Sequence, residues 1–223
     1  DTHQEKFRVE ALELLSDWSD APVADRVHGA YWPVAERDLA QLDSACALLI
    51  ERDILSASDK IASAYIELAK TAKYAASGPA LAALVSDETR DGQLRGRALA
   101  VLHSVGAEEW QAALEVGLQS TDGDLRGASL GQLRKLDPAL ALAQAEDALS
   151  KGGSIPERRA AYTMLGALTD PKAVALLSDE MQKLMRGDLD PKVALELVQG
   201  AEAKDNDGLR ALIKERKAQE ENA

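Results

Sequence analysis

The side chains best suited to bind a metal ion are three histidines and one cysteine, and they stand in four separate segments. They are His3, His28, His103 and Cys46. A structural metal site needs several such ligands that converge, usually at short spacings. No serine lies in a Gly-x-Ser-x-Gly turn, and no histidine is close to Cys46 in the sequence. We therefore expect no metal, no cofactor and no catalytic residue in this chain.

The balance of charge also narrows the possible partners. The 223 residues include 38 acidic and 26 basic side chains, which gives a net charge of −12. Binding to a phosphate backbone depends on Lys and Arg side chains, so we expect no nucleic acid partner. Carboxylate pairs such as Glu108 and Glu109 are typical of solvated helix faces. No apolar run reaches the roughly 18 residues of a membrane span, so we also expect no membrane insertion.

Arginines recur at one position of a repeated helix pattern, namely at Arg95, Arg126 and Arg158. One interpretation is a row of cations that binds an acidic partner. The other, which the acidic surroundings favour, is an internal ladder in which each arginine pairs with a carboxylate of its own or the next repeat. The candidate carboxylates are Asp91, Asp124 and Glu157. Arg97 and Arg159, close to these positions, are more available to a protein partner.

Several of the scarce aromatic side chains gather in the irregular stretch "SDWSDAPVADRVHGAYWPVAERD", residues 16–38. Its apolar side chains suit a cap over the exposed flank of the first helix pair. Alternatively, the stretch is a docking patch for a neighbouring domain, anchored by aromatic and arginine side chains. The anchors would be Trp18, Arg26, Tyr31 and Trp32. Trp110, in "EEWQAALEVGL", either packs in the core between helix pairs or binds a partner.

An internal repeat is the strongest pattern in the chain. The segments "LRGRALAVLHSV" (94–105), "LRGASLGQLRKL" (125–136) and "ERRAAYTMLGAL" (157–168) follow one another at a period of about 32 residues. Their apolar positions superpose in three columns: Leu99, Leu130 and Tyr162; Leu102, Leu133 and Leu165; Val105, Leu136 and Leu168. Two further copies are expected, one at Tyr65 and Leu68 and one at Leu195, Val198 and Ala201.

Partner helices are expected between these copies, over residues 78–87, 108–120, 138–150 and 171–185, so that each repeat is a helical hairpin. Four prolines fall near helix starts, where a missing N–H costs nothing: Pro138, Pro156, Pro171 and Pro191. The candidate N-caps are Ser120, Thr121, Ser154 and Thr169.

A single helix pair cannot cover its own apolar stripe, so successive pairs must stack. The sequence therefore predicts an all-α fold, a right-handed α-solenoid of about five helix pairs with an irregular N-terminal cap. Residues 1–36 would form the first helix and the cap, residues 37–203 the repeats, and residues 204–223 a capping helix with a frayed end. Cys46, on the apolar helix face "LDSACALLIE", is expected to be buried.

The period, the apolar pattern and the arginine that opens the second helix of each pair resemble HEAT repeats, in which an "R-x-x-A-x-x-x-L" helix lines the inner surface. The likeness extends over residues 37–203, although several copies lack the Asp and Val usual around that arginine. More narrowly, "L-x-x-W" followed by "DRVHGAYWPVAERD" (25–38) resembles a segment of large exported proteins of planctomycetes. Those proteins join a sorbosone/glucose dehydrogenase-like β-propeller, a HEAT region and a haem-binding cytochrome c domain. The chain has no Cys-x-x-Cys-His, so haem binding carries over to no residue.

These resemblances imply a non-catalytic scaffold that docks or spaces a neighbouring domain or a separate polypeptide. In the narrower case it is the middle region of an exported dehydrogenase/cytochrome c protein, and periplasmic or otherwise extracytoplasmic; if not, we expect a cytoplasmic adaptor. The alternative is an enzyme or enzyme subunit on a HEAT-like scaffold, of the lyase or alkyl-purine DNA glycosylase type. The glycosylase needs a basic concave face, which the acidic charge disfavours. Because the first residues include neither Met nor an apolar signal region, we expect a mature product or part of a longer protein.

Overall fold

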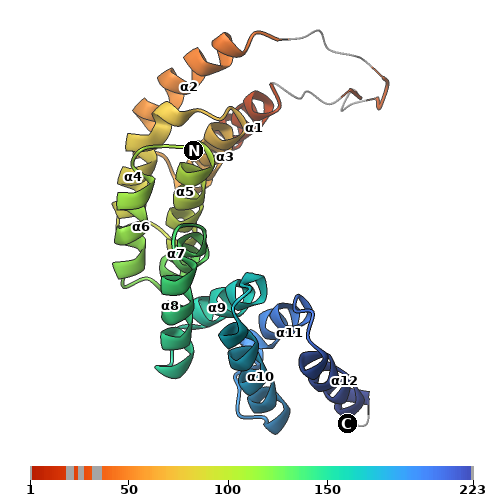
Figure 1. The fold of residues 1–223 in the computed structure, drawn as a ribbon. Helices are drawn as coiled ribbons and strands as arrows, with labels where there is room; N and C mark the ends of the chain where they lie inside the picture. Colours follow the sequence, from red (N-terminus) through yellow and green to blue (C-terminus); the bar gives the residue numbers. More distant parts are fainter. Residues whose placement is uncertain (1, 19–22, 25–27, 32–36, 222–223) are drawn as a thin grey trace. The chain divides into compact units, whose positions relative to one another are not determined.

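The computed structural model describes residues 2–18, 23–24, 28–31 and 37–221, and these residues form an all-helical protein (Figure 1). Within them, the only strand-like contact is one isolated antiparallel bridge between Ala24 and Tyr31. The predicted all-α class is thus confirmed. The α-helices are α1 (Thr2–Ser16), α2 (Leu39–Asp53), α3 (Asp59–Thr71), α4 (Gly78–Ser86), α5 (Gly92–Ser104), α6 (Trp110–Gln119), α7 (Gly123–Leu136), α8 (Pro138–Ser150), α9 (Ile155–Ala167), α10 (Pro171–Arg186), α11 (Ala194–Glu202) and α12 (Asp207–Glu221).

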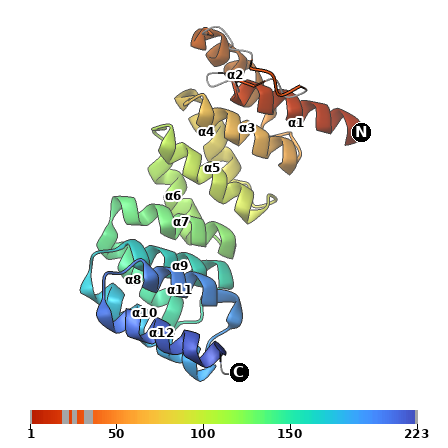
Figure 2. The ribbon, with the colours of Figure 1, turned by 90° about the vertical axis from the view of Figure 1, so that its right-hand side faces the viewer.

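Contacts divide the chain into two compact units, residues 1–116 and 117–223, here called unit 1 and unit 2. In unit 1, α1, α3 and α5 lie side by side, while α2 packs on α3 and α4 packs on α5 (Figure 2). In unit 2, α7, α9 and α11 form a corresponding row, with α8, α10 and α12 packed against it. Each unit is therefore built from helical hairpins. The division between the units falls inside residues 37–203, which the sequence predicts to be one array of repeats. The predicted boundaries at residues 36 and 203 stay a prediction.

Five of the α-helices begin at an aspartate. Asp38, Asp91, Asp122, Asp137 and Asp170 are N-caps whose side chains accept hydrogen bonds from backbone N–H groups in the first turn. The four predicted prolines occupy the first positions of helices, as expected: α8, α9, α10 and the short 3-10 helix Pro191–Val193.

Of the four predicted N-caps, only Ser154 is confirmed. Its hydroxyl accepts from the backbone N–H of Glu157, and the Glu157 carboxylate accepts from the backbone N–H of Ser154, which completes a capping box. The predictions for Ser120, Thr121 and Thr169 were wrong, because Asp122 and Asp170 stand nearer the helix and cap it instead.

The first two predicted apolar columns form the core. Leu99, Tyr162, Leu102 and Leu165 are fully buried, and Leu130 and Leu133 are nearly so. The third column is mixed, since Leu136 is 49 % exposed although Leu168 is buried. The copy predicted at Leu195, Val198 and Ala201 is right for Ala201, which is buried, but wrong for Leu195, which is 63 % exposed while Leu197 is buried in its place. The 3-10 turn ahead of α11 accounts for the shift.

The single thiol lies in the core of unit 1, as predicted. Cys46 on α2 is fully buried, and burial, followed by the nearby Asp43, raises its pKa to about 11. Since the thiolate is the reactive form, native protein at pH 8 should react with Ellman's reagent at least about 100-fold more slowly than protein in guanidinium chloride. Equal rates in the two solutions would show that the α2 helix does not shield this side chain.

Candidate protein-binding groove

An open groove with a volume of about 590 Å³ crosses the exposed faces of α1, α3 and α5 in unit 1. We call it the α1–α3–α5 groove. The charged and hydroxyl side chains that line it come from one face of each of these three helices, because residues three or four positions apart lie on the same face of a helix. The residues that matter below are Glu13, Asp17, Lys60, Ser63, Glu67 and Arg97.

Of the predicted binding residues that the structure describes, Arg97 alone lines this groove. Its guanidinium donates to the Ser63 hydroxyl at 3.0 Å, which ties α5 to α3. The side chain is exposed and has no carboxylate partner among the described residues. Glu67, on the same face of α3, pairs with Lys70 at 3.0 Å on its own helix. The groove is therefore polar and of mixed charge.

The predicted aromatic patch is described only in part. Arg26 and Trp32 lie outside the described residues. Trp18 follows α1, where its indole N–H donates to the Asp38 carbonyl at 3.3 Å and the Arg37 guanidinium lies 4.7 Å from its ring centroid. Tyr31 is 75 % exposed. Trp18 is thus held in place by its neighbours, and neither it nor Tyr31 is part of the groove lining.

Trp110, at the start of α6, is half-buried. Its ring meets His103 edge-on, with centroids 4.5 Å apart, and its indole N–H is buried without an acceptor in the part of the chain that the structure describes. This setting agrees better with the core interpretation than with a binding aromatic, because the ring already has a packing partner.

Arg159 belongs to unit 2 and joins α9 to the turn before α11. Its guanidinium donates to the Lys192 carbonyl at 2.6 and 2.8 Å and lies 3.4 Å from the Glu196 carboxylate. Although the side chain is 47 % exposed, its polar groups are engaged within the unit. Arg159 therefore holds neighbouring hairpins together.

The recurrent arginines behave differently from one another. Arg126 forms the predicted ladder contact, a two-pronged pair with Glu157 at 2.6 and 2.8 Å. Arg95 is 3 % exposed and donates to the Val85 carbonyl at 2.8 Å, without a carboxylate partner among the described residues. Arg158 lies beside the buried Tyr162, whose pKa is raised by burial and by its hydrogen bond to Glu180, with Arg158 opposing the shift. Only one of the three contacts follows the ladder interpretation.

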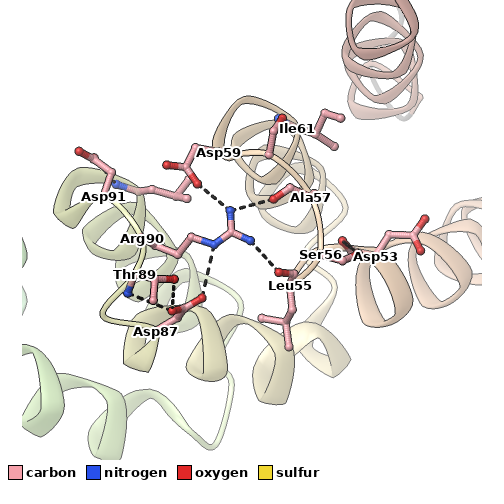
Figure 3. Close-up of polar contacts among 12 residues, drawn as sticks. Asp53, Leu55, Ser56, Ala57, Asp59, Ile61, Asp87, Thr89, Arg90 and Asp91 are labelled. Atoms are coloured by element: carbon pink, nitrogen blue, oxygen red, sulfur yellow. Dashed lines mark hydrogen bonds and ion pairs between the residues drawn. The ribbon is translucent and has the colours of Figure 1, made fainter. Parts of the chain in front are cut away.

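The most extensively bonded arginine, Arg90, is one that the sequence reasoning missed (Figure 3). It lies in the turn before α5 and reaches back to the turn after α2. Its guanidinium donates to the carbonyls of Leu55 and Ala57 at 2.6 and 2.8 Å and to Asp59 at 2.7 Å. The Arg90 Nε–H group also donates to the Asp87 carboxylate, at 3.4 Å. The sequence "SDETRD" could have indicated this role, because it places an arginine among carboxylates in a turn. The repeated helix pattern does not include this arginine.

Several basic side chains share one role: they donate to main-chain carbonyls at or beyond helix ends. Arg90 does so after α2, Arg95 at the end of α4, Arg126 after α6 through Ser120, and Lys204 after α9 through Leu168. The last carbonyls of a helix lack intrahelical partners and carry the negative end of the helix dipole. These four side chains therefore hold neighbouring helices together.

The Arg126–Glu157 pair should make the stability of unit 2 sensitive to acid. The hydrogen bond from Arg126, with those from Ser154, lowers the pKa of Glu157 to about 2 against a partial desolvation effect. Because the pKa of Glu157 is lower in the folded than in the unfolded protein, the ionised carboxylate stabilises the folded state above pH 4.5. This stabilisation is lost as the pH falls from about 4.5 towards 2. Between pH 6 and pH 3, the native protein should lose about 2 kcal/mol that Glu157→Gln does not lose.

Urea unfolding at both pH values, followed by far-UV circular dichroism, measures this difference. Asp179→Asn, on the neighbouring helix α10 of the same unit, is the matched control and should lose stability with acid as the native protein does. If Glu157→Gln and the native protein show the same pH dependence, the pair does not carry the acid sensitivity.

Among the described residues, no three His, Cys, Asp or Glu side chains are grouped so that they could hold a metal ion. In the same part of the chain, no helix has the length and apolar character required to cross a lipid bilayer. Two further hollows, of about 460 Å³ beside Leu15 and Leu49 and about 240 Å³ beside Arg126, are smaller than the groove.

These observations define the class as an all-α protein built from helical hairpins. Comparison with protein-family models, with curated proteins and with solved structures gives no match.

Proposed function

We propose that this protein is a non-catalytic helical scaffold that binds other proteins or protein domains. The observation that carries the proposal is the open α1–α3–α5 groove, which is lined by charged and hydroxyl side chains from three neighbouring helices. Stacked helical repeats typically bind partners along extended surfaces of this kind.

The hairpins are proposed to stack as a right-handed α-solenoid of the HEAT type. The sequence period of about 32 residues and the row of neighbouring helices within each unit support this. Small-angle X-ray scattering tests it, because a compact domain of this length has a radius of gyration of about 17 Å. A superhelix should give a clearly larger value, and a value as small as that of a compact domain would count against the stacking.

Peptide-display selection tests the binding function directly. The whole folded chain would be immobilised and offered a library of random peptides, with an unrelated acidic all-α protein as the control surface. We expect enrichment of peptides that bind the chain and are displaced by soluble chain. Enrichment no greater than on the control surface would contradict a protein-binding role.

The setting within an exported dehydrogenase/cytochrome c protein is a narrower proposal, supported by the sequence of residues 25–38. The coding region on either side of this segment tests it. We expect a signal peptide and a propeller upstream and a Cys-x-x-Cys-His motif downstream. A reading frame without these features would leave an independent adaptor protein as the better description.

A further inference from the structure

The charges of the α1–α3–α5 groove are sorted by sign along its length. Helices α1 and α3 run parallel, since the Ser58 hydroxyl at the start of α3 donates to Glu5 near the start of α1 at 3.0 Å, and both helices start at the same edge in Figure 2. Lys60 lies in the first turn of α3, and Arg97 reaches Ser63 about one turn further on. Glu13 and Glu67 lie towards the C-terminal ends of their helices; Glu67 shares its charge with Lys70, and Glu13 has no ion-pair partner among the described residues. One end of the groove is cationic and the other anionic.

This arrangement works against the stability of the helices that carry it. A cation in the first turn of a helix and a carboxylate in the last turn both oppose the helix dipole. Lys60 occupies the first kind of position and Glu13 the second, and both side chains are exposed. Neither has an ion-pair partner among the described residues. The side chains and the helix dipoles therefore add to a single field along the groove, which a ligand of the opposite polarity would complement.

We propose that the groove binds an extended segment of a partner protein that carries an acidic and a basic side chain about three residues apart. The acidic side chain would meet Lys60 and Arg97, and the basic one Glu13 and Glu67. Lys60 and Glu67 are separated by two turns of α3, which is about 10 Å along the axis. An extended chain covers that distance in about three residues. The inference rests on the proposed function and specifies its partner.

The charge of unit 1 explains why both signs are needed. This unit holds 20 acidic and 11 basic residues, a net charge of −9, and so attracts basic segments in general. Lys60 and Arg97 would repel a wholly basic segment at one end of the groove, and Glu13 and Glu67 would repel a wholly acidic one at the other. A segment with one charge of each sign, correctly spaced, satisfies both ends.

Two labelled eight-residue glycine/serine peptides test the spacing against the whole chain by fluorescence polarisation. In one, a glutamate and a lysine stand three positions apart; in the other, of the same composition, they are adjacent. The separated pair should bind up to about fivefold more tightly, which is the gain that one further exposed ion pair provides, and the difference should shrink in high salt. Equal affinities, or no binding of either peptide at about 1 mM, would overturn the inference.

The substitution Lys60→Glu tests whether the preference for the peptide with separated charges arises in the groove. It should abolish the fivefold difference while leaving the melting temperature unchanged or raised, because glutamate in the first turn of α3 favours the helix. Lys214→Glu, at an exposed position on α12, is the matched control and should keep the difference. If Lys60→Glu keeps it too, the inference is wrong.

The two proposals fail in different ways. Display selection that yields binders indifferent to Lys60→Glu would leave the protein-binding role standing and remove the inference about the groove. Display selection that yields no binders would remove both.

Discussion

Replacing Gly200 with alanine is expected to destabilise unit 2 by about 3 kcal/mol. Helices α9 and α11 touch through their backbones, so that a Cβ on Gly166 would lie 2.8 Å from the Gly200 Cα atom. A Cβ on Gly200 would lie only 2.5 Å from the Tyr162 carbonyl oxygen. Because backbone atoms cannot rotate away as a side-chain end can, the two helices would have to move apart. That movement would loosen the packing around Leu177 and the buried Tyr162.

Gly131→Ala is the matched control for this prediction. Gly131 lies inside α7, and a Cβ there would meet nothing within 4 Å. Alanine should stabilise that helix by about 0.5–1 kcal/mol, since it restricts the unfolded chain more than glycine does. Urea unfolding followed by circular dichroism measures both variants. If the two variants unfolded at similar urea concentrations, the close approach of α9 and α11 would be disproved.

Arg90→Ala should destabilise unit 1 by about 2–3 kcal/mol, the largest effect expected from a charged residue of this unit. The Arg90 side chain is only 15 % exposed, and its removal leaves the Leu55 and Ala57 carbonyls without their donor. Lysine at this position should recover only part of the loss, because a single ammonium group cannot reach both carbonyls and Asp59 in the geometry of a guanidinium.

Arg52→Ala separates this specific effect from a general effect of charge. Arg52 is 70 % exposed and pairs with the adjacent Asp53, so its loss should leave the free energy of unfolding nearly unchanged. All three tryptophans precede residue 117, so their fluorescence reports the unfolding of unit 1 in urea. A loss in Arg90→Ala no larger than in Arg52→Ala would mean that the turn contacts are not stabilising.

The helices and most of the core were predictable because their signals are local. A repeat of about 32 residues and prolines at helix starts place α7, α8, α9 and α10, and the columns at Leu99 and Leu102 are buried as expected. The last copy was wrong at Leu195, because a 3-10 turn precedes α11 and shifts its buried face, an irregularity that periodicity cannot register. The caps failed where threonine and aspartate stood side by side and only the final turn geometry chose between them.

The groove was beyond the reach of sequence patterns. It exists because stripes of α1, α3 and α5 converge, and nothing in the neighbourhood of Glu13 or Lys60 marks either residue as unusual. The charges of α1 and α3 form a pattern only because the two helices run parallel, which places like charges at the same end of the groove. The roles of Arg90, Arg95 and Arg126 were likewise hidden, because these side chains bind backbone oxygens, and every residue of the chain has one.

The use of backbone oxygens as acceptors bears on how such a chain can diverge over evolutionary time. A joint made by Arg90 with the carbonyls of Leu55 and Ala57 does not depend on which side chains that turn carries. Substitutions can therefore accumulate in the turn while the joint persists, provided that the arginine and the turn conformation are retained. Descendants of a common repeat could then lose nearly all sequence likeness and still fasten their hairpins in the same way.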